Sequence, residues 1–280
     1  MHNRASERVF SFAIWSAAAL VAAVFMLVLM DLLWQGVSHL SWNFLFSEPE
    51  NAGRNGGISS ILISTLLIIL VALAVAIPLG LGTAVWLAEY KRRGRTANLV
   101  RLSLDVLAGV PSIVFGLFGN AFFCVFLGLG FSILAGGLTL ACMILPIFIR
   151  TSEAGLSAIG NDWRSGAAAL GMSRATTLWQ VLLPAAAPAI AAGLILGIGR
   201  ATAETAALIF TSGYVDRMPE SLTDSGRSLA VHIYDLSMNV SGGDSAAYAS
   251  ALVLIILIVI LNAIALMLTD YWLAKRITAQ

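Results

Sequence analysis

Long apolar blocks separated by short polar segments dominate the 280-residue sequence. The hydrocarbon core of a membrane is about 30 Å thick, which requires roughly 20 apolar residues in one helix. Five blocks reach this length, namely Val9–Leu33, Ile58–Leu87, Val106–Ile149, Ala185–Phe210 and Ala246–Leu268. The pattern therefore predicts an all-α protein that crosses a membrane several times.

The third block holds 44 residues, which suits two helices better than one. Gly128-Leu129-Gly130 offers a turn inside it, because glycine adopts backbone conformations that other residues avoid. We therefore expect one transmembrane domain over residues 1–280, with six helices at residues 9–33, 58–87, 106–127, 131–149, 185–210 and 246–268. The first block is longer than the usual 7–15-residue core of a signal peptide, so we expect it to be a retained helix.

Composition agrees with a polytopic membrane protein. Hydrophobic residues make up 59% and charged residues 11% of the chain, whereas soluble domains carry about 25% charged residues. The net charge of +1 gives no general attraction for nucleic acid. Cys124 and Cys142 both lie in apolar runs, where we expect free thiols, and no metal or cofactor motif is present.

The distribution of positive charge predicts the orientation. Six spans place both termini on one side, and the four segments of that side hold two, five, three and two Lys or Arg residues, twelve in total. The opposite side holds three, namely Arg54, Arg217 and Arg227. Because positive residues collect in the cytoplasm, we expect cytoplasmic termini, a long cytoplasmic loop at residues 151–183 and outer loops at residues 34–57 and 212–247. Within the last loop, residues 229–236 have the spacing of a short amphipathic helix on the membrane surface.

Arg200 and Glu204 lie inside the fifth predicted span, where each charge costs about 2.5–3.5 kcal/mol. On a continuous helix they are about 40° apart, and Thr211 returns to the same face. Glu204 could simply neutralise Arg200 as a polar staple within the bundle. Alternatively, Arg200 offers fork-shaped donors to an anion that crosses the membrane, and Glu204 orients its guanidinium. We favour the second interpretation and predict a substrate pathway at Arg200, Glu204 and Thr211, with Gly193 and Gly197 packing against another helix.

The predicted cytoplasmic loop is unusually long, since most helix connections have 2–8 residues. Its Ala-rich part predicts a short helix, capped by Asn161 or Asp162 and ended by Gly171 in a left-handed conformation. Ser173 can cap a second helix that leads to Pro184. Two short helices with a glycine corner would form a compact projection from the membrane.

This loop resembles the cytoplasmic signature E-A-A-x3-G-x9-I-x-L-P of ABC-importer permeases. Gly171 is followed by nine residues and then by Val181-Leu182-Leu183-Pro184, whereas Ser165 replaces the glutamate and Gly166 the first alanine. A serine carries no charge, so this position cannot form the salt bridge to an ATPase that the acid of the signature could make. The resemblance assigns ATPase coupling to Ala167, Ala168, Leu170, Gly171, Met172, Ser173, Leu183 and Pro184.

Other segments are similar to permeases of phosphate importers, and the last of them, from Ser228 to Tyr234, looks more like the PstA subunit than like its PstC partner. They are Gly56-Gly57-Ile58, Pro78-Leu79-Gly80, Leu87-Ala88-Glu89-Tyr90, the run from Asp105 to Gly116, Arg200-Ala201-Thr202-Ala203-Glu204-Thr205 and the run from Ser228 to Tyr234. The resemblance implies a type I (MetI-like) importer fold in a bacterial plasma (inner) membrane. It also implies a heterodimer with a PstC-like permease, two copies of a PstB-like ATPase and a PstS-like periplasmic phosphate-binding protein. Family knowledge places the intramembrane Arg and Glu, here Arg200 and Glu204, on the phosphate path.

Other functions stay open at this point. The importer could carry another oxyanion or small solute. An intramembrane enzyme is disfavoured because His2, His39 and His232 all lie outside the predicted spans. A stand-alone carrier or a membrane scaffold would not need the cytoplasmic projection. The sequence holds no G-x4-G-K-[ST] phosphate loop, so a permease of this kind depends on a separate ATPase.

Overall fold

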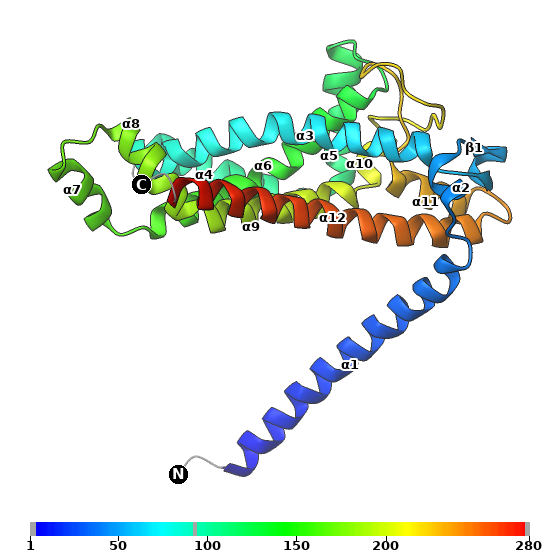
Figure 1. Ribbon diagram of the computed structural model, residues 1–280, viewed down its shortest axis with the longest axis horizontal. Helices are drawn as coiled ribbons and strands as arrows, with labels where there is room; N and C mark the ends of the chain where they lie inside the picture. Colours follow the sequence, from blue (N-terminus) through cyan, green and yellow to red (C-terminus); the bar gives the residue numbers. More distant parts are fainter. Residues whose placement is uncertain (1–3, 92–93, 278–280) are drawn as a thin grey trace.

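The computed structural model describes residues 4–91 and 94–277, and this part of the chain is mostly helical (Figure 1). The long helices are α1 (Arg4–Val37), α3 (Ser59–Val85), α6 (Ile133–Ala158), α9 (Leu183–Thr202) and α12 (Asp244–Ile277). The short helices are α2 (Trp42–Phe46), α4 (Arg95–Ala108), α5 (Ser112–Gly119), α7 (Asn161–Ala169), α8 (Arg174–Thr177), α10 (Ala206–Ile209) and α11 (Leu229–Met238). Tighter or wider helical turns form η1 (Asn51–Gly53), η2 (Trp86–Tyr90), η3 (Asn120–Phe126) and η4 (Leu178–Leu182), and β1 (Pro49–Glu50) pairs antiparallel with β2 (Asn55–Gly56).

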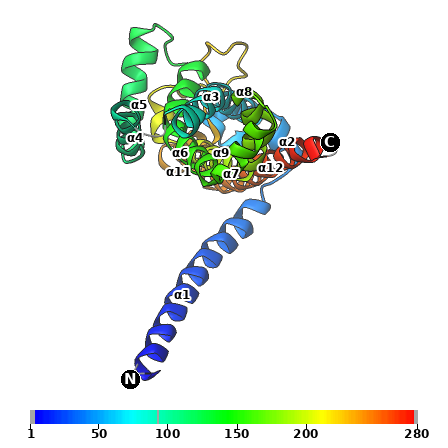
Figure 2. The same cartoon turned by 90° about the vertical axis from the view of Figure 1, so that its left-hand side faces the viewer.

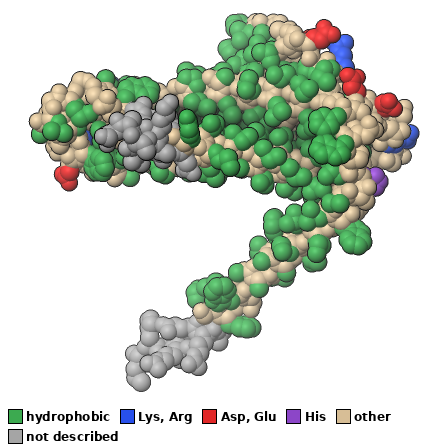
Figure 3. Space-filling model, in the orientation of Figure 1, with side chains coloured by type: hydrophobic (Ala, Val, Ile, Leu, Met, Phe, Trp, Pro, Cys, Tyr) green, Lys and Arg blue, Asp and Glu red, His purple; other side chains and the backbone are tan. Residues whose placement is uncertain are grey.

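Helices α3, α6, α9 and α12 run side by side and form a bundle (Figures 1 and 2). Helices α7 and α8 lie at one end of the bundle, called the knob end below, and the β1–β2 hairpin lies at the other, called the hairpin end. The apolar core between α3, α6 and α9 includes Ile144, Phe148 and Leu208, each at most 1% exposed. Apolar side chains cover the flank of the bundle and α1, whereas the visible charged side chains gather near the two ends (Figure 3).

Small residues allow α6 to approach α9 closely. A β carbon on Gly197 would lie 2.7 Å from Cγ2 of Ile144, and one on Gly155 would overlap Cβ of Ala189. Gly193 faces Thr151 in the same way, at 3.0 Å. The prediction that Gly193 and Gly197 pack against another helix is therefore confirmed.

Five described helical stretches are long and apolar enough to cross a membrane, and a sixth is obtained if one sharply bent pair counts as one span. The first stretch, Phe10–Val37, has none of its most apolar part buried inside the chain. It leaves the bundle at Gly36, which packs against α12 at Tyr248, and extends away from it (Figure 1). The sequence predicted a retained first helix. It did not predict that most of this helix would lie apart from the bundle.

The bent pair corrects the predicted straight helix at residues 106–127. Helix α4 ends at Ala108, and the following α5–η3 segment turns away from it by 106°. Pro111 explains the break, because proline lacks an amide donor and disfavours a helical conformation at Val110. The turn at the end of this segment is as predicted, with Gly128 at φ +70° and Gly130 at φ +61°.

The boundaries around the predicted 151–183 loop also need correction. Helix α6 continues to Ala158 rather than ending at residue 149. The next apolar stretch begins at Arg174, since α8, η4 and α9 form one helical segment of 29 residues. Helix propensity continues beyond the apolar blocks on both sides, so the true connection is limited to Ile159–Ser173.

The outer segment at residues 229–236 is helical as predicted, but its expected position on the membrane surface is wrong. Leu229, Val231, His232 and Leu236 of α11 are all fully buried. Helix α11 packs between α3 and α12 at the hairpin end. Helical spacing shows which residues share a face, but it does not show whether lipid or protein covers that face.

Candidate transport pathway and coupling site

The fifth apolar segment is interrupted at the residues that the sequence predicts as a pathway. Helix α9 ends at Thr202 and α10 begins at Ala206, so the expected continuous helix at residues 185–210 is wrong. Thr202 donates its hydroxyl to the carbonyl of Ile198 (2.7 Å), and Oε1 of Glu204 accepts from the amide of Ala207 (3.1 Å). Polar side chains that bind nearby backbone groups compete with the helical ladder, which accounts for the break.

Arg200 lies in the last turn of α9 with an exposed side chain. Within the described chain it forms no hydrogen bond or ion pair. Glu204 is half-buried and its carboxylate binds the amide of Ala207 in α10, and the predicted pairing with Arg200 one helical turn away does not form. The staple interpretation is therefore wrong for this conformation, and so is the expectation that Glu204 orients the guanidinium of Arg200. The guanidinium lies at the end of a broken helix. Discontinuous membrane helices are places where transporters bind ions and substrates.

Thr211 occupies a different environment from Arg200. Its side chain is fully buried, and its hydroxyl donates to the carbonyl of Ala207 (2.8 Å). Its own carbonyl accepts from the amide of Ser132 (3.0 Å), and its methyl group fills the space beside Gly119 of α5. Thr211 thus joins α10 to α5 and α6, and the helical face that it was expected to share with Arg200 does not exist.

The segment Ile159–Ser173, called the knob below, projects from the bundle and contains α7 (Figure 1). Gly160 is the N-cap of α7, so the predicted caps Asn161 and Asp162 lie inside the first turn instead. Gly171 has φ +73°, and Oγ of Ser173 accepts from the amide of Thr176 (3.1 Å), as the sequence predicted.

The predicted coupling residues divide into an exposed group and a buried group. Leu170 is 81% exposed. Trp163 of α7 was not among the predicted coupling residues, but it lies in the same knob and is 57% exposed. Ala168, Gly171 and Ser173 are exposed and Met172 is half-buried, whereas Ala167 and Leu183 are buried and Pro184 is half-buried in the first turn of α9. Large apolar side chains that stay exposed beyond the apolar spans are typical of a protein-binding surface.

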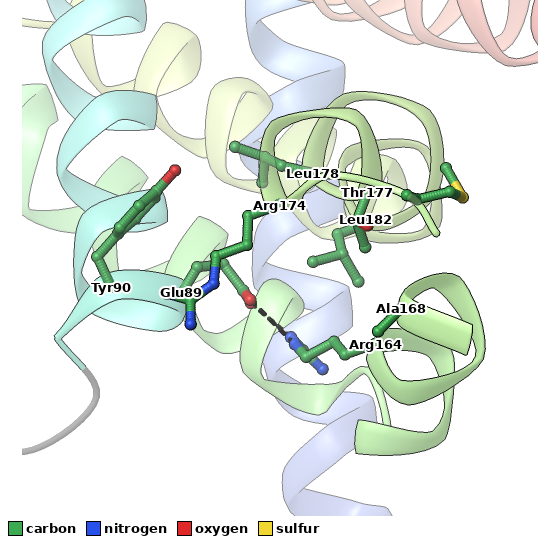
Figure 4. Close-up of a pocket in the computed structure, with 9 residues that line it drawn as sticks. Glu89, Tyr90, Arg164, Ala168, Arg174, Thr177, Leu178 and Leu182 are labelled. Carbon is green, nitrogen blue, oxygen red and sulfur yellow. Dashed lines mark hydrogen bonds and ion pairs between the residues drawn. The ribbon is translucent and has the colours of Figure 1, made fainter. Parts of the chain in front are cut away.

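Arg164 attaches the knob to the bundle (Figure 4). Its Nε donates to Oε2 of Glu89 (3.0 Å), and its other nitrogens donate to the carbonyls of Leu156 (3.0 Å) and Ile159 (2.7 Å). The bond to Glu89 raises the pKa of the guanidinium further and keeps it charged. A cavity of about 280 Å³ lies beside this pair, between η2 and the knob, and is lined also by Tyr90, Ala168, Met172, Arg174, Thr177, Leu178 and Leu182.

A second group of ion pairs connects α4 to α6 near the knob end. Arg101 donates to Glu153 (2.6 Å), and Arg150 pairs with Asp105 while its NH1 lies 3.5 Å from the same Glu153. Glu153 is nearly buried, with 9% of its side chain exposed. These contacts hold α4 against α6, on the N-terminal side of the bend between α4 and α5.

A polar cluster lies at the hairpin end. Arg227, with 9% of its side chain exposed, is 3.2 Å from Asp235 and 3.9 Å from Asp216. It also contacts Nδ1 of His232 at 3.4 Å. Burial first, and then the nearby Arg227 charge, lower the pKa of His232 to about 3, so that this ring is neutral at physiological pH.

Sequence reasoning missed both the Arg164–Glu89 pair and the Arg227 cluster. Arg164 and Glu89 are 75 residues apart, so no local spacing in the sequence predicts their contact. The sequence did offer one signal for the pair, because Glu89 is a charged residue that closely follows an apolar block. Such residues need a partner when the helix end is covered.

The bundle, the broken α9 and the projecting knob define a membrane-spanning transporter subunit. A family model described as "Binding-protein-dependent transport system inner membrane component" matches residues 76–278. The chain belongs to this family.

Curated relatives agree. The probable ABC transporter permease protein YqgI of Bacillus subtilis is 31% identical, and the match covers 94% of each chain. The phosphate transport system permease protein PstA 2 of Mycobacterium bovis is 29% identical over 94% of this chain and 89% of its own. PstA 1 of Mycobacterium tuberculosis is 35% identical over 76% of this chain and 70% of its own. The resemblance to PstA-type permeases is thereby confirmed.

Solved structures show the same fold. A chain from a bacterial ABC transporter involved in the import of the acidic polysaccharide alginate superposes with a TM-score of 0.64, at 14% identity, over 96% of this chain and 99% of that one. A chain from the MetNI methionine ABC transporter gives 0.55, at 17% identity, over 79% and 94%. The predicted MetI-like importer fold is confirmed.

Proposed function

We propose that this chain is a channel-forming subunit of an ATP-driven importer of inorganic phosphate. The observation that supports it most directly is Arg200, an exposed guanidinium without a partner in the described chain, at the break between α9 and α10. A guanidinium fork matches the oxygens of a phosphate group. The names of several relatives point to the same substrate. A different oxyanion is the alternative, because the donor chemistry would be similar.

Energy for transport would come from a separate ATPase. The exposed Leu170 and Trp163 give the knob an apolar face that such a subunit would cover. Alternating access would follow when nucleotide binding moves the knob and the bundle rocks around the Arg200 region. On this proposal the knob faces the cytoplasm, both termini lie there, and two copies of a PstB-like ATPase bind the complex.

A PstC-like permease would supply the other half of the channel, and a PstS-like periplasmic protein would deliver phosphate to the hairpin end. The isolated α1 supports a partner within the membrane. A largely apolar helical stretch of 28 residues, whose most apolar part its own chain leaves uncovered, offers a large surface to another transmembrane subunit. The bacterial plasma membrane is the compartment in which all four components meet.

Reconstituted complexes would test the substrate path. Arg200→Ala should reduce phosphate uptake by about 10- to 100-fold, the value of a lost hydrogen bond to a charged group, while the ATPase stays bound and active. Arg217→Ala is the matched control, because Arg217 is also exposed and without a recorded partner but lies in the outer loop. Full uptake by the Arg200 variant would reject the pathway role. Competition by sulfate or arsenate against labelled phosphate would identify the preferred oxyanion.

A further inference from the structure

Arg164 binds α7 to η2 and to the end of α6. Its guanidinium binds both carboxylate oxygens of Glu89 and three backbone carbonyls at the end of α6, those of Leu156, Ile159 and Gly160. The two charged side chains are only 18% and 15% exposed. A guanidinium is planar, and all the nitrogens of this one donate hydrogen bonds in a place shielded from water. These bonds fix the orientation of α7.

Most other residues of α7 are exposed. Of its nine residues only Arg164 and Ala167 are shielded from the surroundings. The chain before α7 passes through Gly160, and the chain after it turns at Gly171, so both connections contain a flexible residue. The orientation of α7 relative to the bundle therefore depends on the Arg164 contacts.

Glu89 lies in η2, the wide helical turn in which α3 ends. Turns of this kind inside helices occur frequently at functional positions. Leu87 and Ala88 beside it are fully buried, and the carbonyl of Leu87 also accepts from Arg101 of α4 (3.4 Å). The turn is thus a fixed part of the bundle, and Arg164 connects the knob to it.

The opposite end of α3 is bound to the loop that carries the Arg227 cluster. Ser60 donates its hydroxyl to the carbonyl of Asp216, and Thr65 accepts from the amide of Leu229 (2.8 Å). Both contacts come from the first two turns of α3, at the hairpin end of the bundle. One helix therefore connects the knob to the loops at the far end.

We propose that the Arg164–Glu89 ion pair is the joint that makes α7 and α3 move as one body, so that a displacement of the knob reaches the hairpin-end loops. This inference rests on the proposed function, because it needs an ATPase to move the knob. The pair is a positioning element and does not touch the transported solute. When it is broken, α7 turns about Gly160 and Gly171 without moving α3.

The reconstituted importer with its ATPase tests this joint. Glu89→Gln keeps the shape of the side chain but removes its charge. The variant should retain the ATPase and its hydrolysis rate within about twofold, whereas phosphate transported per ATP should fall about tenfold. Arg164→Lys, which keeps the charge but loses the fork, should show the same split. The exchange Glu89→Arg with Arg164→Glu should recover part of the transport that each single change removes.

Asp105→Asn is the matched control. It also removes a carboxylate paired with an arginine near the knob end, but that pair joins α4 to α6 and leaves α7 untouched. Its ratio of transport to hydrolysis should equal that of the unmodified protein. Two results would overturn the joint: an unchanged ratio in Glu89→Gln, or loss of the ATPase from that variant, which would show that the pair only maintains the docking surface.

A second measurement does not depend on the solute. Spin labels at Leu170→Cys on the knob and Leu70→Cys on the exposed face of α3, in a background with Cys124 and Cys142 replaced by alanine, report the distance between the two elements. The distance should stay narrow and constant when nucleotide binds, and Glu89→Gln should broaden it. A broad distribution before any substitution would reject the joint. If the labels behave as expected but phosphate is not transported, the proposed substrate is wrong and the joint stands.

Discussion

The guanidinium Nε of Arg101 lies 2.6 Å from Oε1 of Glu153, which joins α4 to α6 across 52 residues of sequence. This pair holds the short amphipathic α4 in place before the chain turns by 106° at Pro111. The side chain of Glu153 is 9% exposed, so its charge depends on arginines rather than on water for stabilisation.

Arg101→Met should destabilise the protein by about 2–3 kcal/mol, because it leaves a nearly buried carboxylate with only Arg150 at 3.5 Å. Adding Glu153→Leu should recover most of this loss, since the uncompensated charge is then removed. Thermal unfolding in detergent measures both. Asp105→Asn, at an exposed pair, should change stability by less than about 1 kcal/mol. A double variant no more stable than Arg101→Met would contradict the explanation.

Gly171→Ala should destabilise the knob by about 1–2 kcal/mol and weaken ATPase binding in co-purification. The cause is purely conformational, because φ is +73° there and no atom lies within 4 Å of the added β carbon. Gly166→Ala is the matched control, since Gly166 lies inside α7 with equally open space. This change should strengthen the helix by about 0.5–1 kcal/mol. Equal effects of the two substitutions would show that backbone conformation is not the cause.

The seam between α6 and α9 predicts a compensating exchange. Gly155→Ala places a methyl group against Cβ of Ala189 and should cost about 1–3 kcal/mol through overpacking. When Gly155→Ala is combined with Ala189→Gly, the methyl group moves from α9 to α6. The gain in helix propensity in α6 then offsets the loss in α9. The double variant should therefore be more stable than the sum of the single effects by about 2 kcal/mol. Additive melting temperatures would mean that the two helices separate rather than pack as described.

Acid should loosen the hairpin end through His232. Its pKa is about 3 in the folded protein against 6.5 in an unfolded chain, because it is buried beside Arg227, with Asp235 opposing the shift. Below pH 6.5 the unfolded chain binds a proton that the folded ring does not, so stability falls as the pH falls. Between pH 6.5 and 5 the loss should be about 1.5 kcal/mol.

His232→Asn should flatten that part of the profile of melting temperature against pH, whereas substitution of the exposed His39 should leave it unchanged. An identical slope in the His232 variant would assign the pH dependence to other groups.

The sequence alone determined the class of the protein. Apolar blocks of membrane-spanning length, the glycine turn at Gly128 and Gly130, and the Gly171–Ser173 corner of the knob are local properties, since they depend on composition or on residues a few positions apart. The order of motifs along the chain then identified the permease family. None of these inferences required knowledge of which helices touch.

The tertiary structure decided where those elements lie and what their polar residues do. Thr202 and Glu204 bind backbone groups where α9 ends. Arg200 therefore does not pair with Glu204, although the two would share a face on a continuous helix. The spacing of α11 could not distinguish a lipid-facing helix from one covered by α3 and α12. Glu89 and Arg164 meet only because α3 and the knob come together at one end of the bundle. Long-range contacts of this kind leave no periodic signal, because their geometry is set by the packing of whole helices rather than by neighbouring residues.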